Sequence, residues 1–327
     1  MKCVVTGATG CLGLNLTKRL ITEGHEVIAL GRNQHQGTIL TQLGAQFVTL
    51  DLSEKNRLQQ LARHAELIFH CAALSSPWGS YKDFYQANVI GTQHVIAATP
   101  HHARLIHVSS PSIYFDFSEK HHIKEETVLP PKPVNHYIKT KRIAESLIDK
   151  AHREQHLQVI TLRPRALFGP YDRAIFPRLL KAERNGILPL IGTGKNIIDI
   201  TYVDNVVESL ILAAQATNQC LGKKYNITND EPQKLITIIT ELYDALQKPL
   251  KVKYIPYPLA KTVAHCLEVL YRLPCISQEP RLTAYSAGVL ALGQTLNIDA
   301  AKKDLGYKPI VSIGEGLQRF AHWYHSL

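Results

Sequence analysis

The sequence predicts an α/β fold, with a doubly wound parallel sheet followed by a smaller, mostly helical C-terminal domain. Three observations support this prediction. Short apolar runs alternate with helical segments in the first half of the chain, as in a parallel sheet that helices cover on both faces. A glycine-rich turn joins the first apolar run to the first helix. The alternation stops in the C-terminal third, where four prolines interrupt the chain: Pro256, Pro258, Pro274 and Pro280.

The individual elements follow from the local pattern. A first helix is expected from Leu12 to Glu23, because leucines recur on one face and Gly24 follows as a helix-terminating residue. A longer helix is expected from Tyr137 to Lys150. The expected strands are short and apolar and lie at 3–5, 27–30, 47–50, 67–70, 105–108 and 159–162.

Composition excludes several classes of protein. The 327 residues are 45% hydrophobic and 20% charged, as in globular domains, and the net charge of +10 is dispersed, which argues against a nucleic-acid partner. The six cysteines and sixteen histidines show no zinc-site spacing, so no metal site is expected and the thiols are expected to be reduced. The chain has no apolar run of ~20 residues and no signal-peptide pattern, which predicts a cytoplasmic protein without a spanning helix.

The segment between the first strand and the first helix carries glycines at positions 7, 10 and 13. Gly7 permits a tight turn, Gly10 lets the backbone approach a pyrophosphate, and Gly13 lets the helix pack closely on the sheet. The helix N-terminus adds N–H donors and the positive end of a dipole. This context predicts a bound dinucleotide.

The end of the second strand bears on the choice of cofactor. An NAD site usually has an acidic residue about 20 residues after the glycine turn, but here the strand ends with Gly31, Arg32 and Asn33. Glycine removes a charge that would repel a 2′-phosphate, and Arg32 offers a charged, planar fork. NADP is therefore expected. NAD remains the alternative if Arg32 points to solvent or stacks on the adenine, and Asp51 is expected to face the adenine.

Tyr137 and Lys141 are four residues apart in the expected helix, so their side chains share a face. A free tyrosine has a pKa of about 10, and a nearby ammonium favours the phenolate, so Lys141 is expected to lower this pKa. Tyr137 would then donate a proton to a carbonyl or accept one from an alcohol. The same spacing recurs at Tyr257 and Lys261, but there a proline follows and no strand-end serine precedes it.

These motifs together resemble the extended short-chain dehydrogenase/reductase family, within the NAD-dependent epimerase/dehydratase superfamily. The resemblance covers nearly the whole chain and is weaker in the C-terminal third. It implies a homodimer formed through the helices that carry Asn88 and Tyr137. Besides the glycine turn, it rests on residues 70–73, 88–92, 163–164, 168–170 and 199–204.

The resemblance also implies roles for single residues. Ser110, four residues before Tyr114, would hydrogen-bond the substrate oxygen; the alternatives are Ser109 or a hydroxyl that only caps backbone groups. Lys141 would also hold the nicotinamide ribose, and Asn88 would hold a water or a backbone carbonyl near it. The expected cofactor-binding residues are Gly7, Thr9, Gly10, Cys11, Leu12, Gly13, Arg32, Asp51, Leu52, Cys71, Ala72, Ala73, Tyr137, Lys141 and Pro164.

Two domains are expected from these assignments. Residues 1–168 and 198–229 would form a Rossmann-type dinucleotide-binding domain. Residues 169–197 and 230–327 would form the substrate-binding cap.

Further segments resemble the 3β-hydroxysteroid dehydrogenase-like branch and the bacterial 2-alkyl-3-oxoalkanoate reductases: 108–114, 280–283, 299–307 and 314–317. This implies hydride transfer between a nicotinamide cofactor and a ketone or secondary alcohol on a bulky apolar substrate, sterol-like or a 3-oxoacyl lipid. A nucleotide-sugar epimerase or dehydratase is the alternative, although Pro111 and Ser112 stand where a dehydratase has an Asp-Glu pair. A third hypothesis is a non-catalytic protein that has kept the fold.

Residues 257–275 form an apolar stripe at helical spacing, with Leu259, Val263, Leu267 and Leu270. One interpretation is a lid over a lipid-like substrate that touches a membrane surface peripherally. The other is a cap helix packed on its own domain. The sequence leaves both open.

Overall fold

The computed structural model describes residues 1–272 and 278–327. The last residues of the stripe at 257–275, together with Pro274 and Cys275, lie outside the described residues.

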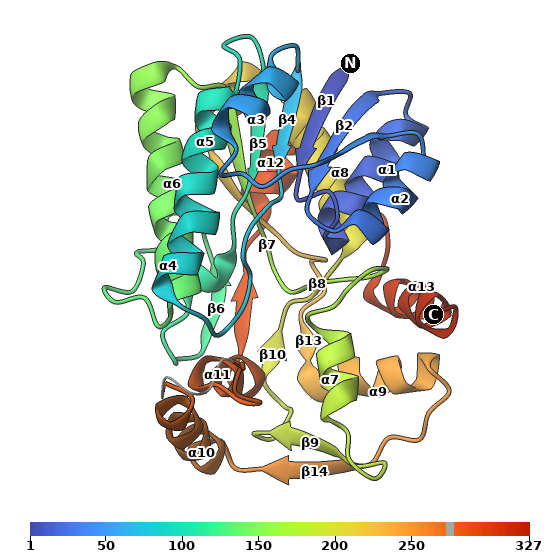
Figure 1. Ribbon diagram of the computed structural model, residues 1–327. Helices are drawn as coiled ribbons and strands as arrows, with labels where there is room; N and C mark the ends of the chain where they lie inside the picture. Colours follow the sequence, from blue (N-terminus) through green and yellow to red (C-terminus); the bar gives the residue numbers. More distant parts are fainter. Residues whose placement is uncertain (273–277) are drawn as a thin grey trace.

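A seven-stranded sheet lies at the centre of the upper part of the molecule (Figure 1), with strand order β12-β7-β5-β4-β1-β2-β3. All six neighbouring pairs are parallel. Each of the six apolar runs singled out from the sequence lies in this sheet, which confirms the doubly wound parallel fold. The strands are β1 (Lys2–Thr6), β2 (Glu26–Gly31), β3 (Gln46–Thr49), β4 (Leu67–His70), β5 (Arg104–Val108), β7 (Val159–Pro164) and β12 (Lys224–Ile227).

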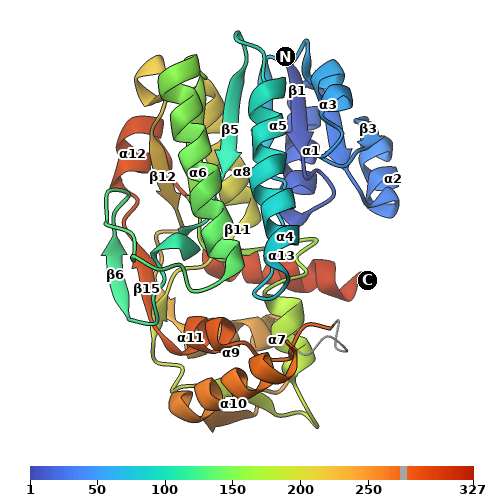
Figure 2. The ribbon, with the colours of Figure 1, turned by 60° about the vertical axis from the view of Figure 1, so that its left-hand side comes forward.

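Helices cover both faces of this sheet (Figures 1 and 2). On one face lie α1 (Cys11–Thr22), α2 (Gln34–Gln42) and α8 (Val203–Gln215); on the other lie α3 (Lys55–Ala62), α5 (Gly91–Ala98) and α6 (His136–Gln155). Alternate residues of each strand point to opposite faces, so Val4 and Val5 are both fully buried but belong to different apolar clusters. This double burial explains why the strands are apolar throughout.

The two expected helices are confirmed, with small differences at their ends. Helix α1 is capped by Glu23 and followed by Gly24 with φ +79°, as the glycine signal predicted. Helix α6 starts after Asn135, whose side chain accepts a hydrogen bond from the N–H of Ile138 at 2.8 Å. It runs to Gln155, beyond the expected end at Lys150.

The lower part holds α7 (Phe176–Ala182), α9 (Leu235–Ala245), α10 (Tyr257–Leu270) and α11 (Ala284–Ala291). It also contains short strands that the sequence analysis did not predict. β9 (Leu188–Ile191) pairs with β14 (Val252–Ile255), and β8 (Leu167–Phe168) pairs with β11 (Thr201–Tyr202). A four-stranded sheet joins β13 (Gln233–Lys234), β10 (Ile197–Ile198), β15 (Gln294–Leu296) and β6 (Lys120–Ile123).

Two elements cross the expected division into domains. Strand β6 comes from the first segment but pairs with β15 of the lower part. Helix α12 (Asp299–Leu305) comes from the last segment but packs on β12 and α8, behind the large sheet. The C-terminal helix α13 (Ile313–His325) contacts both α9 and β11.

The apolar stripe of α10 faces outward. Ala260 and Ala264 form the buried side of this helix, whereas Leu259, Val263 and Leu270 are 56%, 46% and 49% exposed. The interpretation that this stripe packs on its own domain is therefore wrong for these three side chains. Among the helices of the described residues, none is both long and apolar enough to cross a bilayer.

Candidate active site

The turn after β1 is tightly packed against the turn after β4. Gly7 has φ +69°, and a Cβ atom there would lie 2.7 Å from the backbone of Ala72. A Cβ atom on Gly13 would lie 2.3 Å from the carbonyl oxygen of Gly7, so helix α1 approaches the turn as closely as glycine allows. Strand order reverses between β1 and β4, and ligands of doubly wound sheets bind at such a switch point.

The remaining residues of the glycine turn open helix α1. Gly10 is its N-cap and provides no side chain, so the first-turn N–H groups of Cys11 and Leu12 point out of the helix end. The thiol of Cys11 lies 3.3 Å from the carbonyl oxygen of Pro170, and burial raises its pKa, so it stays protonated. This end can bind a pyrophosphate through backbone donors and the helix dipole.

The end of β2 is crowded against a side chain of the glycine turn. A Cβ atom on Gly31 would lie 2.6 Å from Cγ2 of Thr9, so an aspartate there would require Thr9 to move. Arg32 follows and is 75% exposed, with its Nη1 3.5 Å from Oδ2 of Asp51. The pKa of Asp51 is lowered by hydrogen bonds from Ser53 and by Arg32. The structure thus brings Arg32 and Asp51 together beyond the carboxyl ends of β2 and β3, beside Leu52.

The turn after β4 is held by Asn88. Its Oδ1 accepts a hydrogen bond from the N–H of Leu74 at 2.7 Å, and its Nδ2 donates to the carbonyl of Leu74 and to Oγ1 of Thr140, both at 3.1 Å. Asn88 is buried in the π-helical segment η1 (Tyr85–Ile90), an irregularity often found at functional sites. It therefore ties the turn that contains Cys71, Ala72 and Ala73 to α6.

Tyr137, Lys141 and Ser110 meet at the carboxyl end of β5. Ser110 precedes the short helix η2 (Pro111–Tyr114) and hydrogen-bonds through its Oγ to Ser112 at 2.8 Å. The Nζ of Lys141 donates to the carbonyl of Val108 at 2.8 Å. Burial raises the pKa of Tyr137, and hydrogen bonding with Ser110 and Ser75 offsets part of that shift.

The expected lowering of the Tyr137 pKa by Lys141 is not found. Burial dominates at Tyr137, so its hydroxyl keeps its proton at neutral pH. Burial also lowers the pKa of Lys141 to about 8, partly offset by Glu145, and its ammonium is directed at a backbone carbonyl. The shared helical face brings Tyr137 and Lys141 to one site, but the protein environment sets the protonation of each.

A buried ion pair lies one helical turn beyond Lys141. Glu145 accepts two hydrogen bonds from Arg163 of β7, at 2.9 and 2.5 Å, and both side chains are about 95% buried. Arg163 also donates to the hydroxyl of Tyr114. This network fixes α6 against β7 and so holds Lys141 in register with the sheet.

Three site residues were not singled out from the sequence: Ser75, Ser112 and Tyr285. Tyr285 comes from α11 in the lower part. Its pKa is raised to about 12, mainly by burial; Arg165 and a hydrogen bond with Ser112 oppose this shift, and Tyr137 adds to it. No local motif marks Tyr285, because its segment lies where the family resemblance is weak. Ser75 and Ser112 adjoin recognised motifs, and that proximity could have identified them.

The second Tyr-x-x-x-Lys pair lies elsewhere. Tyr257 begins α10, and Lys261 lies over the ring of Phe117, with its Nζ 5.3 Å from the ring centroid. The histidines next to the site are not arranged as ligands: His70 and His107 stack at 5.7 Å, and burial lowers the pKa of His70 to about 3. Within residues 1–272 and 278–327, no group of three or more His, Cys, Asp or Glu side chains could hold a metal ion.

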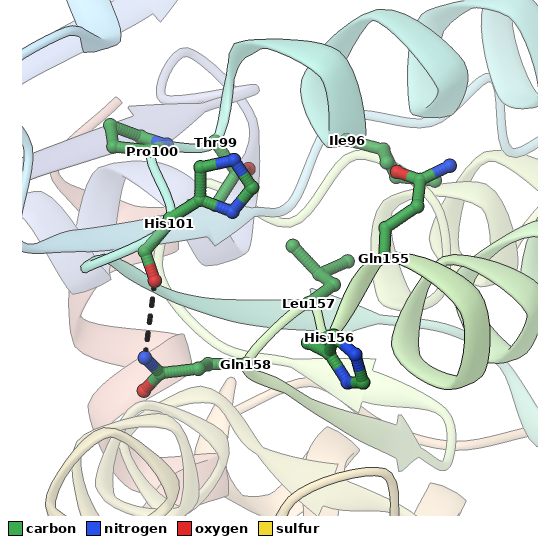
Figure 3. A pocket seen from close by; sticks show the side chains of 8 residues that line it. All are labelled: Ile96, Thr99, Pro100, His101, Gln155, His156, Leu157 and Gln158. Carbon is green, nitrogen blue, oxygen red and sulfur yellow. Dashed lines mark hydrogen bonds between the residues drawn. The ribbon is translucent and has the colours of Figure 1, made fainter.

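A shallow pocket lies at the opposite end of the sheet (Figure 3). It is lined by residues around the amino ends of β5 and β7, where Gln158 donates a hydrogen bond to the carbonyl of His101 at 3.2 Å. None of the candidate site residues lines it. The side chains drawn are Ile96, Thr99, Pro100, His101, Gln155, His156, Leu157 and Gln158.

A glycine turn at the switch point of a parallel sheet, with a tyrosine, a lysine and a serine beside it, defines a Rossmann-type dinucleotide-binding protein. Comparison with known families makes the assignment specific. The model of the NAD dependent epimerase/dehydratase family matches residues 3–228, and the chain belongs to this family.

Two relatives and one solved structure illustrate the similarity. The chain is 35% identical to a 2-alkyl-3-oxoalkanoate reductase of Stenotrophomonas maltophilia (strain K279a), over 98% of both chains. It is 31% identical to the mouse (Mus musculus) sterol-4-alpha-carboxylate 3-dehydrogenase, decarboxylating, over 100% of this chain and 91% of the relative. The structure of UDP-glucuronic acid 4-epimerase from Bacillus cereus in complex with NAD superposes with a TM-score of 0.79 at 23% identity, covering 100% and 99% of the two chains, which shows the shared fold.

Proposed function

We propose that this protein is an NADP-dependent oxidoreductase that transfers a hydride between the nicotinamide and a ketone or secondary alcohol on a bulky, apolar substrate. The observation that carries the proposal is the meeting of the Tyr137 hydroxyl with Ser110 at the carboxyl end of β5, next to the dinucleotide turn. The relatives named as a 3-oxoalkanoate reductase and a sterol dehydrogenase support a lipid-like substrate.

Each residue has a distinct part in this proposal. The cofactor supplies or accepts the hydride when bound. Ser110 holds the substrate oxygen, and Tyr137 gives it a proton during reduction or takes one during oxidation. Lys141 holds the nicotinamide ribose and stabilises the negative charge that forms on Tyr137. Asn88 acts through the turn after β4, which it keeps against α6.

The raised pKa of Tyr137 supports the reductive direction. A tyrosine that keeps its proton at neutral pH is already in the form that a carbonyl needs as its acid. Oxidation would first require the phenolate, which burial disfavours.

NADP is proposed over NAD because of the end of β2. Gly31 carries no acid that would repel a 2′-phosphate, and any side chain there would displace Thr9. The exposed Arg32 is free to turn toward the phosphate at the cost of a weak contact with Asp51. The remaining cofactor contacts are proposed at the turns that carry Gly7–Gly13, Cys71–Ala73 and Pro164. We also infer a substrate-binding role for the lower part, since Tyr285 reaches the site from α11, and a homodimer through the outer helices α5 and α6 (Figure 2).

NADPH oxidation with sterol ketones, long-chain 3-oxoacyl compounds and UDP-sugars tests the proposal. A lipid ketone should be reduced, and Tyr137→Phe should lower kcat by about 10²–10⁴-fold while NADPH binding survives. Tyr257→Phe is the matched control and should leave kcat unchanged, because Tyr257 lies at the start of α10. Near-native kcat in Tyr137→Phe, or turnover of UDP-sugars alone, would refute the proposal.

A further inference from the structure

Arg165 is a buried cation that forms no ion pair with the described residues. It follows Pro164 at the carboxyl end of β7 and is 7% exposed. Its Nε is buried and has no hydrogen-bond partner. Among the described residues, no carboxylate oxygen lies within 4.0 Å of the Arg165 guanidinium. Every ion pair within that distance joins two other side chains.

Arg163, two residues earlier in β7, is a buried arginine with a purely structural role and serves as a comparison for Arg165. It is equally buried, but its Nε and Nη2 both donate to Glu145 and its Nη1 donates to the hydroxyl of Tyr114. Burial lowers the pKa of Arg165, whereas hydrogen bonding and charge from Glu145 outweigh burial and raise the pKa of Arg163. The two arginines therefore differ in their partners and not in their burial.

The surroundings of Arg165 belong to the active site. Tyr285 is the group that most offsets the loss of solvation at Arg165, and Tyr285 in turn interacts with Tyr137 and hydrogen-bonds with Ser112. Asp199 is the acidic group that favours the charged form of Arg165, but the two side chains form no ion pair, and Oδ2 of Asp199 accepts a hydrogen bond from the N–H of Leu296 at 2.7 Å. Arg165 thus lies beside Tyr285, close to the hydroxyls proposed to hold the reacting oxygen.

An uncompensated buried charge is costly, and buried arginines are normally paired. The guanidinium fork matches the two oxygens of a carboxylate. The pyrophosphate of the cofactor is not the missing partner, because the glycine turn follows β1, and β4 and β5 lie between β1 and β7 in the sheet. A single cation also balances a monoanion better than a phosphate dianion.

We propose that Arg165 binds the carboxylate of the substrate, so that this enzyme acts on an oxo acid or hydroxy acid whose carboxylate lies near the reacting carbon. This assignment rests on the oxidoreductase function proposed above and names the chemical class of its substrate. The apolar remainder of the substrate would then extend away from Arg165.

Equilibrium binding tests the assignment without requiring turnover. The NADP⁺-loaded protein is titrated with a long-chain 2-alkyl-3-hydroxy acid and with its methyl ester, which has the same carbon skeleton and no charge. The acid should bind more tightly than the ester. Arg165→Met should weaken acid binding on the order of 10²-fold, as loss of one partner of a buried charge pair does, with little change for the ester or NADPH. Arg165→Lys should restore part of the preference for the acid.

Stability provides a second readout. Arg165→Met removes a buried, unpaired charge, so the ligand-free variant should unfold at the same or a higher temperature than the wild type. Arg163→Met should unfold at a lower temperature, because it leaves Glu145 buried without its partner. A clear drop in the unfolding temperature of Arg165→Met would identify Arg165 as structural and overturn the assignment.

The remaining outcomes separate the two proposals. Equal binding of acid and ester by the wild type, binding of neither, or equal losses for both ligands in Arg165→Met, would refute the role of Arg165. Binding of the acid that depends on Arg165, without oxidation of the acid by NADP⁺ or reduction of its 3-oxo form by NADPH, would support the carboxylate site and refute the oxidoreductase.

Discussion

Cofactor preference should depend on Arg32, and the structure sets the size of the effect. The side chain is 75% exposed and lies 3.5 Å from a half-exposed Asp51. Such a surface ion pair contributes at most about 1 kcal/mol of stabilisation. The guanidinium can therefore rotate toward a 2′-phosphate at little cost in free energy. A hydrogen bond to a charged group contributes about 1.5–3 kcal/mol to the free energy of binding. Because Arg32 is exposed to solvent, we expect a contribution at the lower end of this range. Arg32→Ala should therefore weaken NADPH binding by about 10-fold.

Isothermal titration with NADPH and NADH measures this effect directly. The wild type should prefer NADPH, and Arg32→Ala should lose that preference while NADH affinity stays within about 2-fold, since NADH lacks the phosphate. Asp51→Asn is the matched control: it removes the carboxylate that competes for Arg32, so NADPH affinity should hold or increase. Equal binding of NADH and NADPH by the wild type, or equal weakening of both cofactors in Arg32→Ala, would refute a role of Arg32 in cofactor choice.

Four further predictions concern the glycine turn, the buried Arg163–Glu145 pair and Lys141. Gly7→Ala should cost more stability and more NADPH affinity than Gly24→Ala, because both glycines have positive φ but only at Gly7 does a Cβ atom meet backbone, at 2.7 Å; equal losses in thermal unfolding would contradict this. Arg163→Met should lower the free energy of unfolding by about 3–5 kcal/mol in urea titrations, because Glu145 is left buried without its partner, and an unchanged midpoint would refute the pairing. Burial holds the pKa of Lys141 at about 8, so its ammonium is lost as pH rises through that value, and kcat/KM for reduction should fall above about pH 8; a flat profile to pH 9.5 would argue against a charged Lys141. The same group should make the fold more stable as pH rises from about 8 to 10.5, because the unfolded chain there binds the proton that the folded chain has released.

Local spacing in the sequence was sufficient for the sheet and for the dinucleotide turn. The strands are buried on both faces, which makes them apolar throughout and separable from the helices between them. Gly13 is required by a contact within the first β-turn-α unit, Gly7 takes the positive φ of that turn, and Tyr137 and Lys141 share a helical face by their spacing alone. These features depend on neighbours in the chain, so a pattern of residues could predict them.

Only the tertiary structure decided the features that depend on distant segments. It brought Tyr285 from α11 to Tyr137, left Arg165 without a carboxylate while pairing Arg163 with Glu145, and turned the leucine stripe of α10 outward by burying its alanines. It also reversed the expected direction of the Tyr137 pKa shift. Solvation and charge at a buried group are set by every element packed around it, and those elements are far apart in the sequence.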